Sequence, residues 1–429
     1  MATEVDSEGW LTLGGVRLAL LARDASIGTP SYVYDLDAIA REARELRAAF
    51  EGVPHLVAYA VKANTAGPIV RALAAEGCGA DVVSGGELAV ALGCGIAADD
   101  IVFSGVAKTD DEIDRALAAG ARGVGAIQLE SVEEIARVAA RAKALGRRAR
   151  VSMRINPAVS FDALDTHAHI ATGHDEAKFG IPSVDVVSAL ERVRGLPELE
   201  LVGLTVHVGS QITATEAYVE AARVVLGFAR GLRDAGVTSL AFVDTGGGFG
   251  IDYGAGCAVR PADFVRAVRV EQSRARLDDL ALYVEPGRSL VAAHAVLLAT
   301  VIQPKIAASR RWLMIDAGMN DLIRPALYQA RHRIAPLERD VTASVSEVAW
   351  CVVGPVCESS DDFGIHSLPS APPRDVALLD AGAYGFTMAS RYNGRPLPAE
   401  VFLRGGEVAF HHAREPVDRW VADRLRDES

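Results

Sequence analysis

The feature of this sequence that most constrains its fold is a regular alternation of short apolar runs with longer amphipathic segments. The runs have the length and apolar composition of buried strands. They cover residues 56–61, 80–83, 101–104, 123–128, 149–155, 201–207, 240–244 and 281–285. The segments between them repeat apolar residues at helical spacing, as at 66–76, 110–119, 131–146, 215–235 and 261–275. Eight β/α units over about 230 residues predict a (β/α)8 barrel.

The same alternation is compatible with a doubly wound open sheet, and the count of eight units favours the barrel. Start signals support several of the helices. At Ser131 the sequence Ser-Val-Glu-Glu places Glu134 three residues after a serine, which predicts a capping box.

The pattern changes after about residue 290, where helical periodicity becomes scarce and Pro and Gly interrupt short strand-like runs. These runs lie at 296–302, 312–316, 345–353 and 376–379. They predict a mostly β second domain. The first 35 residues end in the strand-like SYVYD and are expected to pair with it. The predicted domains are therefore a barrel at 36–290 and a β-rich domain formed by 1–35 and 291–429.

Composition and charge exclude several functional classes. The chain has 429 residues and a formal net charge of −12, and no block of basic residues indicates nucleic-acid binding. The acidic N-terminus lacks the features of a signal peptide, and no apolar stretch has the length of a membrane span. The five cysteines form no CxxC pair, which argues against a zinc site. We therefore expect reduced thiols and a cytoplasmic protein without a metal.

Polar groups recur where the predicted strands end, and in a barrel those ends share the catalytic face. They are Lys62, Ser84, Arg154 with Asn156, His207, the glycines 246–248, and the segment 285–288. Any one of them alone is more often structural: glycine clusters are usually turns, and a lone histidine is usually a hydrogen-bonded core residue. Their convergence on one face favours a functional site.

The chemistry of this set suits an aldehyde cofactor that carries a phosphate. A lysine amine forms a Schiff base with pyridoxal phosphate, and a glycine-rich turn can hold the phosphate through backbone N–H groups. Glu285 is the candidate acid against the pyridine nitrogen, and His207 the candidate for stacking on the ring.

The motifs around these residues resemble those of a known family, the pyridoxal-phosphate decarboxylases with the alanine-racemase-like (fold type III) barrel. AYAVKAN (58–64), HVGSQI (207–212), TGGGFG (245–250) and EPGR (285–288) belong to the match, and of these YAVKAN and EPGR mark the wider fold group. The segments 28–35, 79–88, 172–181, 380–385 and 390–401 extend the match nearly end to end. DAGMNDLIRPALY (316–328) and GPVCESSD (354–361) are more specific to the diaminopimelate branch.

The resemblance implies a role for each matching residue. Lys62 would bind the cofactor aldehyde, Glu285 the pyridine nitrogen, and His207 the ring face. The remaining cofactor-binding residues would be Asp81, Ser210, Gly247, Gly248, Gly287, Arg288 and Tyr384. The substrate would contact Arg288, Arg324, Tyr328, Glu358 and Tyr384. Cys357 would donate a proton to the α-carbon after CO2 leaves. Cys357 and Glu358 would reach the partner subunit's site, which implies a homodimer.

The implied reaction is conversion of meso-diaminopimelate to L-lysine and CO2, the last step of lysine biosynthesis. A substrate with a distal carboxylate and amine needs an arginine clamp and an acid, which Arg324 and Glu358 would supply. The alternatives are decarboxylation of ornithine, lysine or a related amino acid, racemisation, and a non-catalytic cofactor carrier. Arg324 argues against the first, Glu285 against racemisation, and retention of Cys357, Glu358 and Tyr384 against the carrier.

Overall fold

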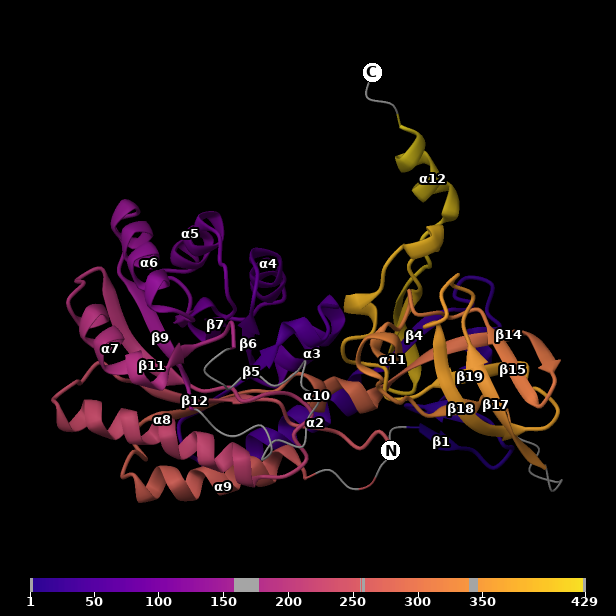
Figure 1. Ribbon diagram of the computed structural model, residues 1–429, viewed down its shortest axis with the longest axis horizontal. Coiled ribbons are helices and arrows are strands. Elements are labelled where there is room, and N and C mark those ends of the chain that lie inside the picture. The colour runs from indigo at the N-terminus through magenta and orange to yellow at the C-terminus, as the bar shows by residue number, and fades with distance from the viewer. Residues whose placement is uncertain (1–2, 158–176, 255, 257–258, 339–345, 427–429) are drawn as a thin grey trace. The chain divides into compact units, whose positions relative to one another are not determined.

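A computed structural model describes residues 3–157, 177–254, 256, 259–338 and 346–426 of the chain (Figure 1). The chain divides into two compact units. The barrel unit comprises Ala40–Ile251 and Cys257–Ser289, and the β unit comprises Met1–Ile39, Asp252–Gly256 and Leu290–Ser429. The observed division thus gives residues 252–256 to the β unit, whereas the sequence-based boundaries at 36 and 290 kept them with the barrel. Part of the motif at 172–181 lies outside the described residues.

Eight parallel strands form the barrel, and each overlaps one of the predicted apolar runs. They are β5 (His55–Ala60), β6 (Gly79–Val82), β7 (Ile101–Phe103), β8 (Ala126–Leu129), β9 (Ala149–Asn156), β11 (Leu199–Thr205), β12 (Phe242–Gly247) and β13 (Ala281–Glu285). β13 pairs with β5, and β8 pairs with β9. These two pairings close the ring. The predicted barrel is therefore confirmed, and the open-sheet alternative is wrong.

Helices surround this ring of strands (Figure 1). They are α3 (Gly67–Ala75), α4 (Gly85–Gly93), α5 (Asp110–Ala118), α6 (Val132–Ala144), α7 (Val186–Arg194), α8 (Glu216–Asp234) and α9 (Pro261–Arg274), with α2 (Leu36–Ala48) entering and α10 (Arg288–Val291) leaving the barrel sequence. Each long helix buries one apolar stripe. In α8, for example, Ala222, Val225 and Ala229 are buried, at the spacing that puts them on one face.

The predicted capping box at Ser131 is wrong in one of its two bonds. Ser131 Oγ accepts the Glu134 N–H at 3.3 Å, as expected. The Glu134 carboxylate, however, accepts a hydrogen bond from the N–H of Glu130 at 2.8 Å rather than from that of Ser131, and its other oxygen accepts a hydrogen bond from the Lys108 ammonium. A buried ammonium needs a carboxylate partner, which fixes Glu134 in this position. A complete capping box forms instead at Thr109 and Glu112.

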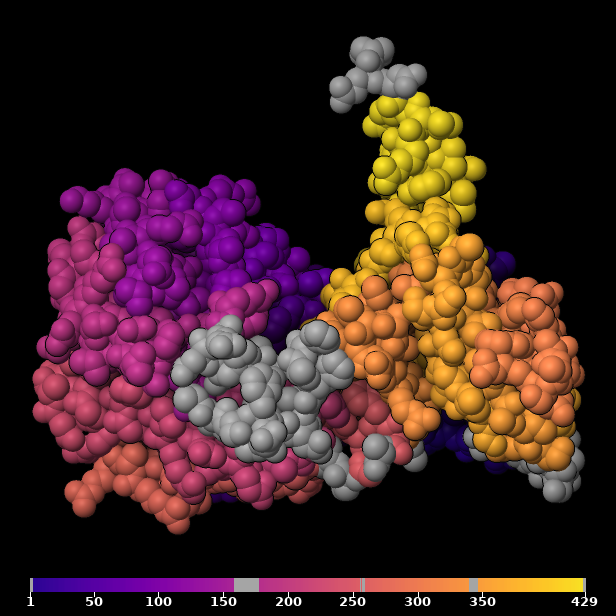
Figure 2. Space-filling view, in the orientation of Figure 1, coloured from indigo at the N-terminus to yellow at the C-terminus, as the bar shows by residue number. Residues whose placement is uncertain are grey.

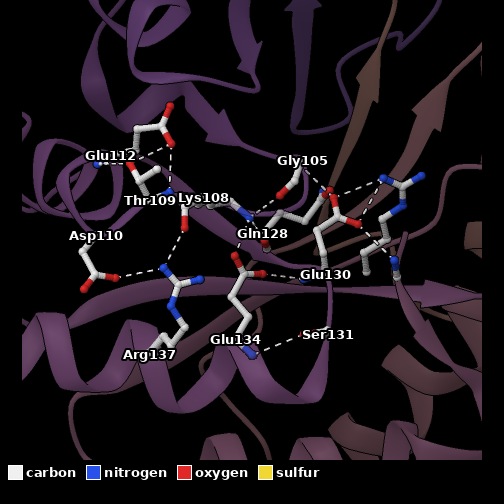
Figure 3. Close-up of polar contacts among 12 residues, drawn as sticks. Gly105, Lys108, Thr109, Asp110, Glu112, Gln128, Glu130, Ser131, Glu134 and Arg137 are labelled. Atoms are coloured by element: carbon white, nitrogen blue, oxygen red, sulfur yellow. Dashed lines mark hydrogen bonds and ion pairs between the residues drawn. The ribbon is translucent and has the colours of Figure 1, made fainter. Parts of the chain in front are cut away.

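The buried side chain of Lys108 connects the ends of two barrel strands through hydrogen bonds (Figure 3). Its side chain is 1% exposed, and its ammonium donates to the carbonyls of Gly105 at 2.6 Å and Gln128 at 2.7 Å. Its third bond goes to Glu134 at 3.0 Å. Gly105 follows β7 and Gln128 lies in β8. The three bonds therefore fix the carboxyl ends of both strands.

The second unit is built on a β-sheet with strand order β18-β17-β15-β14-β4-β20-β21; β19 also pairs with β14, and β16 pairs with β19. Its strands are β4 (Ser31–Asp35), β14 (Ala295–Ala307), β15 (Arg310–Ile315), β16 (Ile334–Pro336), β17 (Glu347–Val353), β18 (Asp362–Pro369), β19 (Asp375–Leu378), β20 (Ala399–Arg404) and β21 (Glu407–His412). A small sheet of β1 (Thr3–Val5), β2 (Leu11–Leu13) and β3 (Val16–Arg17) precedes β4. The predicted β domain is confirmed, although residue 345 of one predicted run lies outside the described residues.

The strand β4, from the N-terminal segment, lies inside this sheet, which confirms the predicted pairing of that segment with the β domain. β4 pairs antiparallel with β14 and parallel with β20. Its five residues are all buried. Within the same unit, the C-terminal helix α12 (Val417–Leu425) stands out from the sheet and has no buried residue (Figure 2). None of the helices in the described part of the chain combines the length and apolarity needed to cross a membrane.

Replacing Lys108 with Met should lower the free energy of unfolding by about 3–5 kcal/mol, because a buried carboxylate and two carbonyls lose their cation. The matched control is Arg115→Met, which breaks an exposed pair with Asp111 at 2.8 Å and should cost about 0.5 kcal/mol or less. Urea unfolding followed by circular dichroism measures both. Equal small losses in the two variants would contradict a structural role for Lys108.

Candidate functional site

A cavity of about 360 Å³ opens at the carboxyl ends of the barrel strands. It is lined by Lys62, Val83, Ser104, Gly105, Val106, Arg154, Phe179, His207 and Glu285. Three residues singled out from the sequence, Lys62, His207 and Glu285, thus line one cavity although they are far apart in the chain. Catalytic groups of (β/α)8 barrels occupy this position.

Lys62 lies in a 3-10 turn, Val61–Ala63, that directly follows β5. Its ammonium forms an ion pair with Asp81, which lies in the neighbouring strand β6 and is completely buried. The Lys62 side chain is 36% exposed. The strand therefore fixes the base of the side chain, while the amine reaches a space that a small molecule can enter.

Glu285, at the end of β13, lies in surroundings that favour its protonated form. It is 5% exposed, and burial, followed by the charges of Asp244 and Asp81, raises its pKa well above the usual range. Burial also raises the pKa of Asp244 to about 7. The charge of Asp244 contributes to the shift at Glu285, since two neighbouring buried carboxyl groups cannot both ionise at low cost. Glu285 can therefore serve as a hydrogen-bond donor in the cavity.

His207 is a neutral imidazole in this arrangement. Its Nδ1 accepts the N–H of Gly247 at 3.1 Å, so Nδ1 carries no proton. Burial, followed by the positive charges of Arg154 and Lys62, lowers the pKa of His207 well below its usual value. The 4.0 Å approach of Nδ1 to Glu285 is accordingly not an ion pair. A neutral, flat ring can stack on another ring without a charge to desolvate.

The glycines at the end of β12 allow three strand ends to approach closely. A Cβ on Gly247 would lie 1.9 Å from the Glu285 carbonyl, and one on Gly248 would lie 2.1 Å from the Gly209 carbonyl. Gly248 also has a φ of +88°, a left-handed conformation that favours glycine. Beside them, Arg288 donates to Ser210 Oγ at 3.0 Å. Gly287 is less tightly enclosed, since a Cβ on it would lie 3.0 Å from that of Ala63.

Arg154 lines the cavity, but the sequence analysis gave it no role although it noted that the residue ends a strand. Its guanidinium is 7% exposed and donates to both oxygens of Glu130, at 3.1 and 3.3 Å. It also lies 4.9 Å from the ring centre of Phe179. Glu130 is held in turn by the N–H groups of Gly105 and Gly180, each at 3.0 Å (Figure 3). Arg154 is thus a fixed positive charge beside His207.

The remaining predicted residues lie in the β unit. Arg324 begins the short helix α11 (Arg324–Tyr328) and is buried, whereas Tyr328 at its end is partly exposed. Tyr384 is partly exposed and has a φ of +56°. Cys357 and Glu358 are exposed in the loop 354–361 between β17 and β18. Among the predicted substrate-binding and proton-donating residues, Arg324 is therefore buried, whereas Cys357 and Glu358 are exposed.

His332 is a second residue that the sequence analysis missed. Its Nε2 accepts a hydrogen bond from Arg324 at 2.8 Å, because arginine can only donate, and its Nδ1–H donates to the Leu379 carbonyl at 2.9 Å. Arg324 also lies 4.9 Å from the ring centre of Tyr253. His332 and Tyr253 together orient the guanidinium. Neither residue lies in a motif, so the sequence gave no signal for them.

Comparison with known proteins agrees with this geometry. Residues 36–292 match the family model described as the pyridoxal binding domain of pyridoxal-dependent decarboxylases. The diaminopimelate decarboxylase of Zymomonas mobilis is 41% identical, and the alignment covers 94% of this chain and 93% of that protein. This chain belongs to the diaminopimelate decarboxylase family.

Solved structures of this family extend the match to three dimensions. The M. jannaschii diaminopimelate decarboxylase in complex with L-lysine has a TM-score of 0.90 and 34% identity, covering 99% of this chain and 98% of that one. The Helicobacter pylori diaminopimelate decarboxylase complexed with L-lysine has a TM-score of 0.84 and 36% identity, covering 92% and 97%. The whole length of this chain therefore has the architecture of the family.

The lowered pKa of His207 predicts a pH dependence of stability. Below about pH 6.5 the unfolded chain takes up a proton at this histidine that the folded chain does not. The free energy of unfolding therefore decreases as the pH is lowered, by up to about 1.4 kcal/mol per pH unit. His207→Gln should reduce this slope between pH 6.5 and 5, as measured by urea unfolding. His412→Gln, which removes an exposed imidazole, is the control. An unchanged slope in His207→Gln would argue against the neutral assignment.

Proposed function

We propose that this chain converts meso-diaminopimelate to L-lysine and CO2, the last step of lysine biosynthesis, as a pyridoxal-phosphate-dependent carboxy-lyase. The single observation that carries the proposal is the joint presence of Lys62, His207 and Glu285 in one cavity at the strand ends. Membership of the diaminopimelate decarboxylase family supports the choice of substrate.

The residues present fit pyridoxal phosphate. Lys62 would bind the aldehyde, and Asp81 holds that amine on the cavity side of β5. Glu285 would hold a proton against the pyridine nitrogen, and His207 would lie on the ring face. When bound, the cofactor withdraws electrons from the substrate α-carbon. Gly247, Gly248, Ser210, Gly287 and Arg288 would surround the phosphate, and Tyr384 completes the proposed set. The close approach at Gly247 and Gly248 leaves no room there for side chains.

Arg324 supports diaminopimelate over ornithine or lysine. The substrate's distal carboxylate would pair with a guanidinium, which can make two parallel hydrogen bonds to it. His332 and Tyr253 hold Arg324 in one orientation. Arg288, Tyr328, Glu358 and Tyr384 are the other proposed substrate contacts. Ornithine and lysine lack the second carboxylate, so they could not form this pair of hydrogen bonds with Arg324.

We propose that two chains associate and complete each other's sites. Cys357 would donate a proton to the α-carbon, and Glu358 would contact the substrate, both in the partner's site. Both side chains are exposed in the single chain, which supports such a role. The proposed location is the cytoplasm, and among the described residues Cys78, Cys94, Cys351 and Cys357 are free thiols, as expected in a reducing compartment.

Release of CO2 from meso-diaminopimelate, ornithine and lysine tests the substrate assignment. We expect turnover of meso-diaminopimelate with kcat/KM at least about a hundredfold above the other two, since two charge-assisted hydrogen bonds from Arg324 to the distal carboxylate contribute about 3 kcal/mol or more. Arg324→Met should remove most of this preference. Faster turnover of ornithine or lysine would support the alternative decarboxylase and contradict the proposal.

Mixing two inactive variants tests the shared sites. Lys62→Ala should lose the visible absorption band of the lysine-bound cofactor, and Cys357→Ala should keep that band but turn over slowly. Unfolded and refolded together, the two variants should form mixed dimers in which one of the two sites is intact. Mixing should therefore restore activity to about a quarter of the wild-type level, as expected for random pairing. Absence of recovery would contradict the shared-site arrangement.

A further inference from the structure

The loop that carries Cys357 and Glu358 is anchored at its base by a buried carboxylate. Asp361 is 3% exposed, and its oxygens accept the N–H groups of Val356 and Met319, each at 2.6 Å. Gly354 fits against this carboxylate so closely that a Cβ there would lie 2.4 Å from an Asp361 oxygen. The base of the loop is thus fixed, but these contacts do not reach the exposed residues at its tip.

A second segment, residues 390–394, forms hydrogen bonds with the tip of this loop. Asn393 Oδ1 accepts the backbone N–H of Cys357 at 2.8 Å, and the Tyr392 hydroxyl donates to the Glu358 carboxylate at 2.5 Å. The two bonds connect consecutive residues of one segment to consecutive residues of the other. The bond to Glu358 also raises the pKa of Tyr392, so the phenol remains the donor and the carboxylate the acceptor.

The holding segment has its own supports. Asn393 has a φ of +55°, a left-handed conformation that asparagine tolerates better than most residues. Arg391 donates to both oxygens of Glu415, at 2.6 and 2.8 Å. Gly394 packs against Trp420 of α12, since a Cβ on it would lie 3.1 Å from that ring. The segment 390–394 is therefore held in place by contacts of its own, in addition to its two hydrogen bonds to the loop.

We propose that Tyr392 and Asn393 are positioning residues for Glu358 and Cys357, and that this clamp sets how the loop presents both groups to a substrate. The inference rests on the proposed function. Exposed hydrogen bonds contribute little to stability, whereas both of these end on residues with proposed chemical roles. Asn393 fixes the Cys357 backbone and so limits the directions its thiol can take. Tyr392 occupies one Glu358 oxygen and leaves the other to accept from a substrate amine.

The two clamp residues should therefore affect different kinetic constants. Tyr392→Phe should raise the KM for meso-diaminopimelate about five- to tenfold with kcat and the visible cofactor band unchanged, because one oriented hydrogen bond is lost. Asn393→Gly keeps the left-handed backbone but removes the acceptor, and should lower kcat about tenfold with KM nearly unchanged. Asn393→Asp retains an acceptor oxygen and should restore most of that kcat.

A matched control and a mixing experiment separate positioning from general loss of structure. Ser346→Ala removes an exposed side-chain bond to Ser370, 3.0 Å long, at the opposite end of β17 and β18, and should leave kcat and KM unchanged. Asn393→Gly mixed with Lys62→Ala should recover activity, because each mixed dimer has one site with an intact lysine and an intact loop. Mixed with Cys357→Ala it should not recover, because every site then has a defective loop.

The outcomes distinguish the inference from the proposed function. Normal kcat and KM in Tyr392→Phe and Asn393→Gly, with Cys357→Ala still slow, would overturn the clamp and leave the proposed function standing. Equal kcat losses in Asn393→Gly and Asn393→Asp would also overturn it, since the acceptor would then not matter. Normal turnover in Cys357→Ala would contradict both the proposed proton donor and the role of Asn393.

Discussion

The hydrogen bonding between β8 and β9 closes a parallel sheet into a ring, and the chemistry of the barrel unit depends on that closure. In a ring of parallel strands every carboxyl end lies at the same rim. Lys62, Asp81, Arg154, His207 and Glu285 come from five different strands, yet they share one rim. Loss of the pairing between any two strands would separate groups that must act on one molecule.

The rim combines charged pairs with neutral polar groups. Lys62 pairs with Asp81, and Arg154 pairs with Glu130. Burial lowers the pKa of His207 and raises that of Glu285, which favours the neutral form of both. The cavity therefore combines one amine with two groups whose neutral forms are favoured. It keeps its remaining charges neutralised, which limits the cost of burying them.

The local sequence pattern was sufficient to predict the barrel strands and the residues at their ends. Each predicted apolar run overlaps a strand, and the residues that follow parallel strands of a barrel all lie at the same rim. Contacts between distant segments were not predictable in this way. The orientation of Arg154 depends on its bonds to Glu130, which follows β8. In the same way, the orientation of Arg324 depends on His332 and that of the Cys357 backbone on Asn393. At Glu134 a local rule failed, because this carboxylate binds a buried lysine from another segment and the N–H of Glu130 instead of that of Ser131.

The central position of β4 has a consequence for how the protein is made. Its partners, Ala295–Ala307 and Ala399–Arg404, are synthesised more than two hundred residues after it. The barrel strands, by contrast, pair mostly with their neighbours in sequence. A nascent chain can therefore complete the barrel while β4 still lacks both neighbours, and contacts between such distant segments form slowly. A ribosome that stops before residue 399 would release a chain with a closed barrel and an incomplete β-sheet, whose edge is open to aggregation or proteolysis.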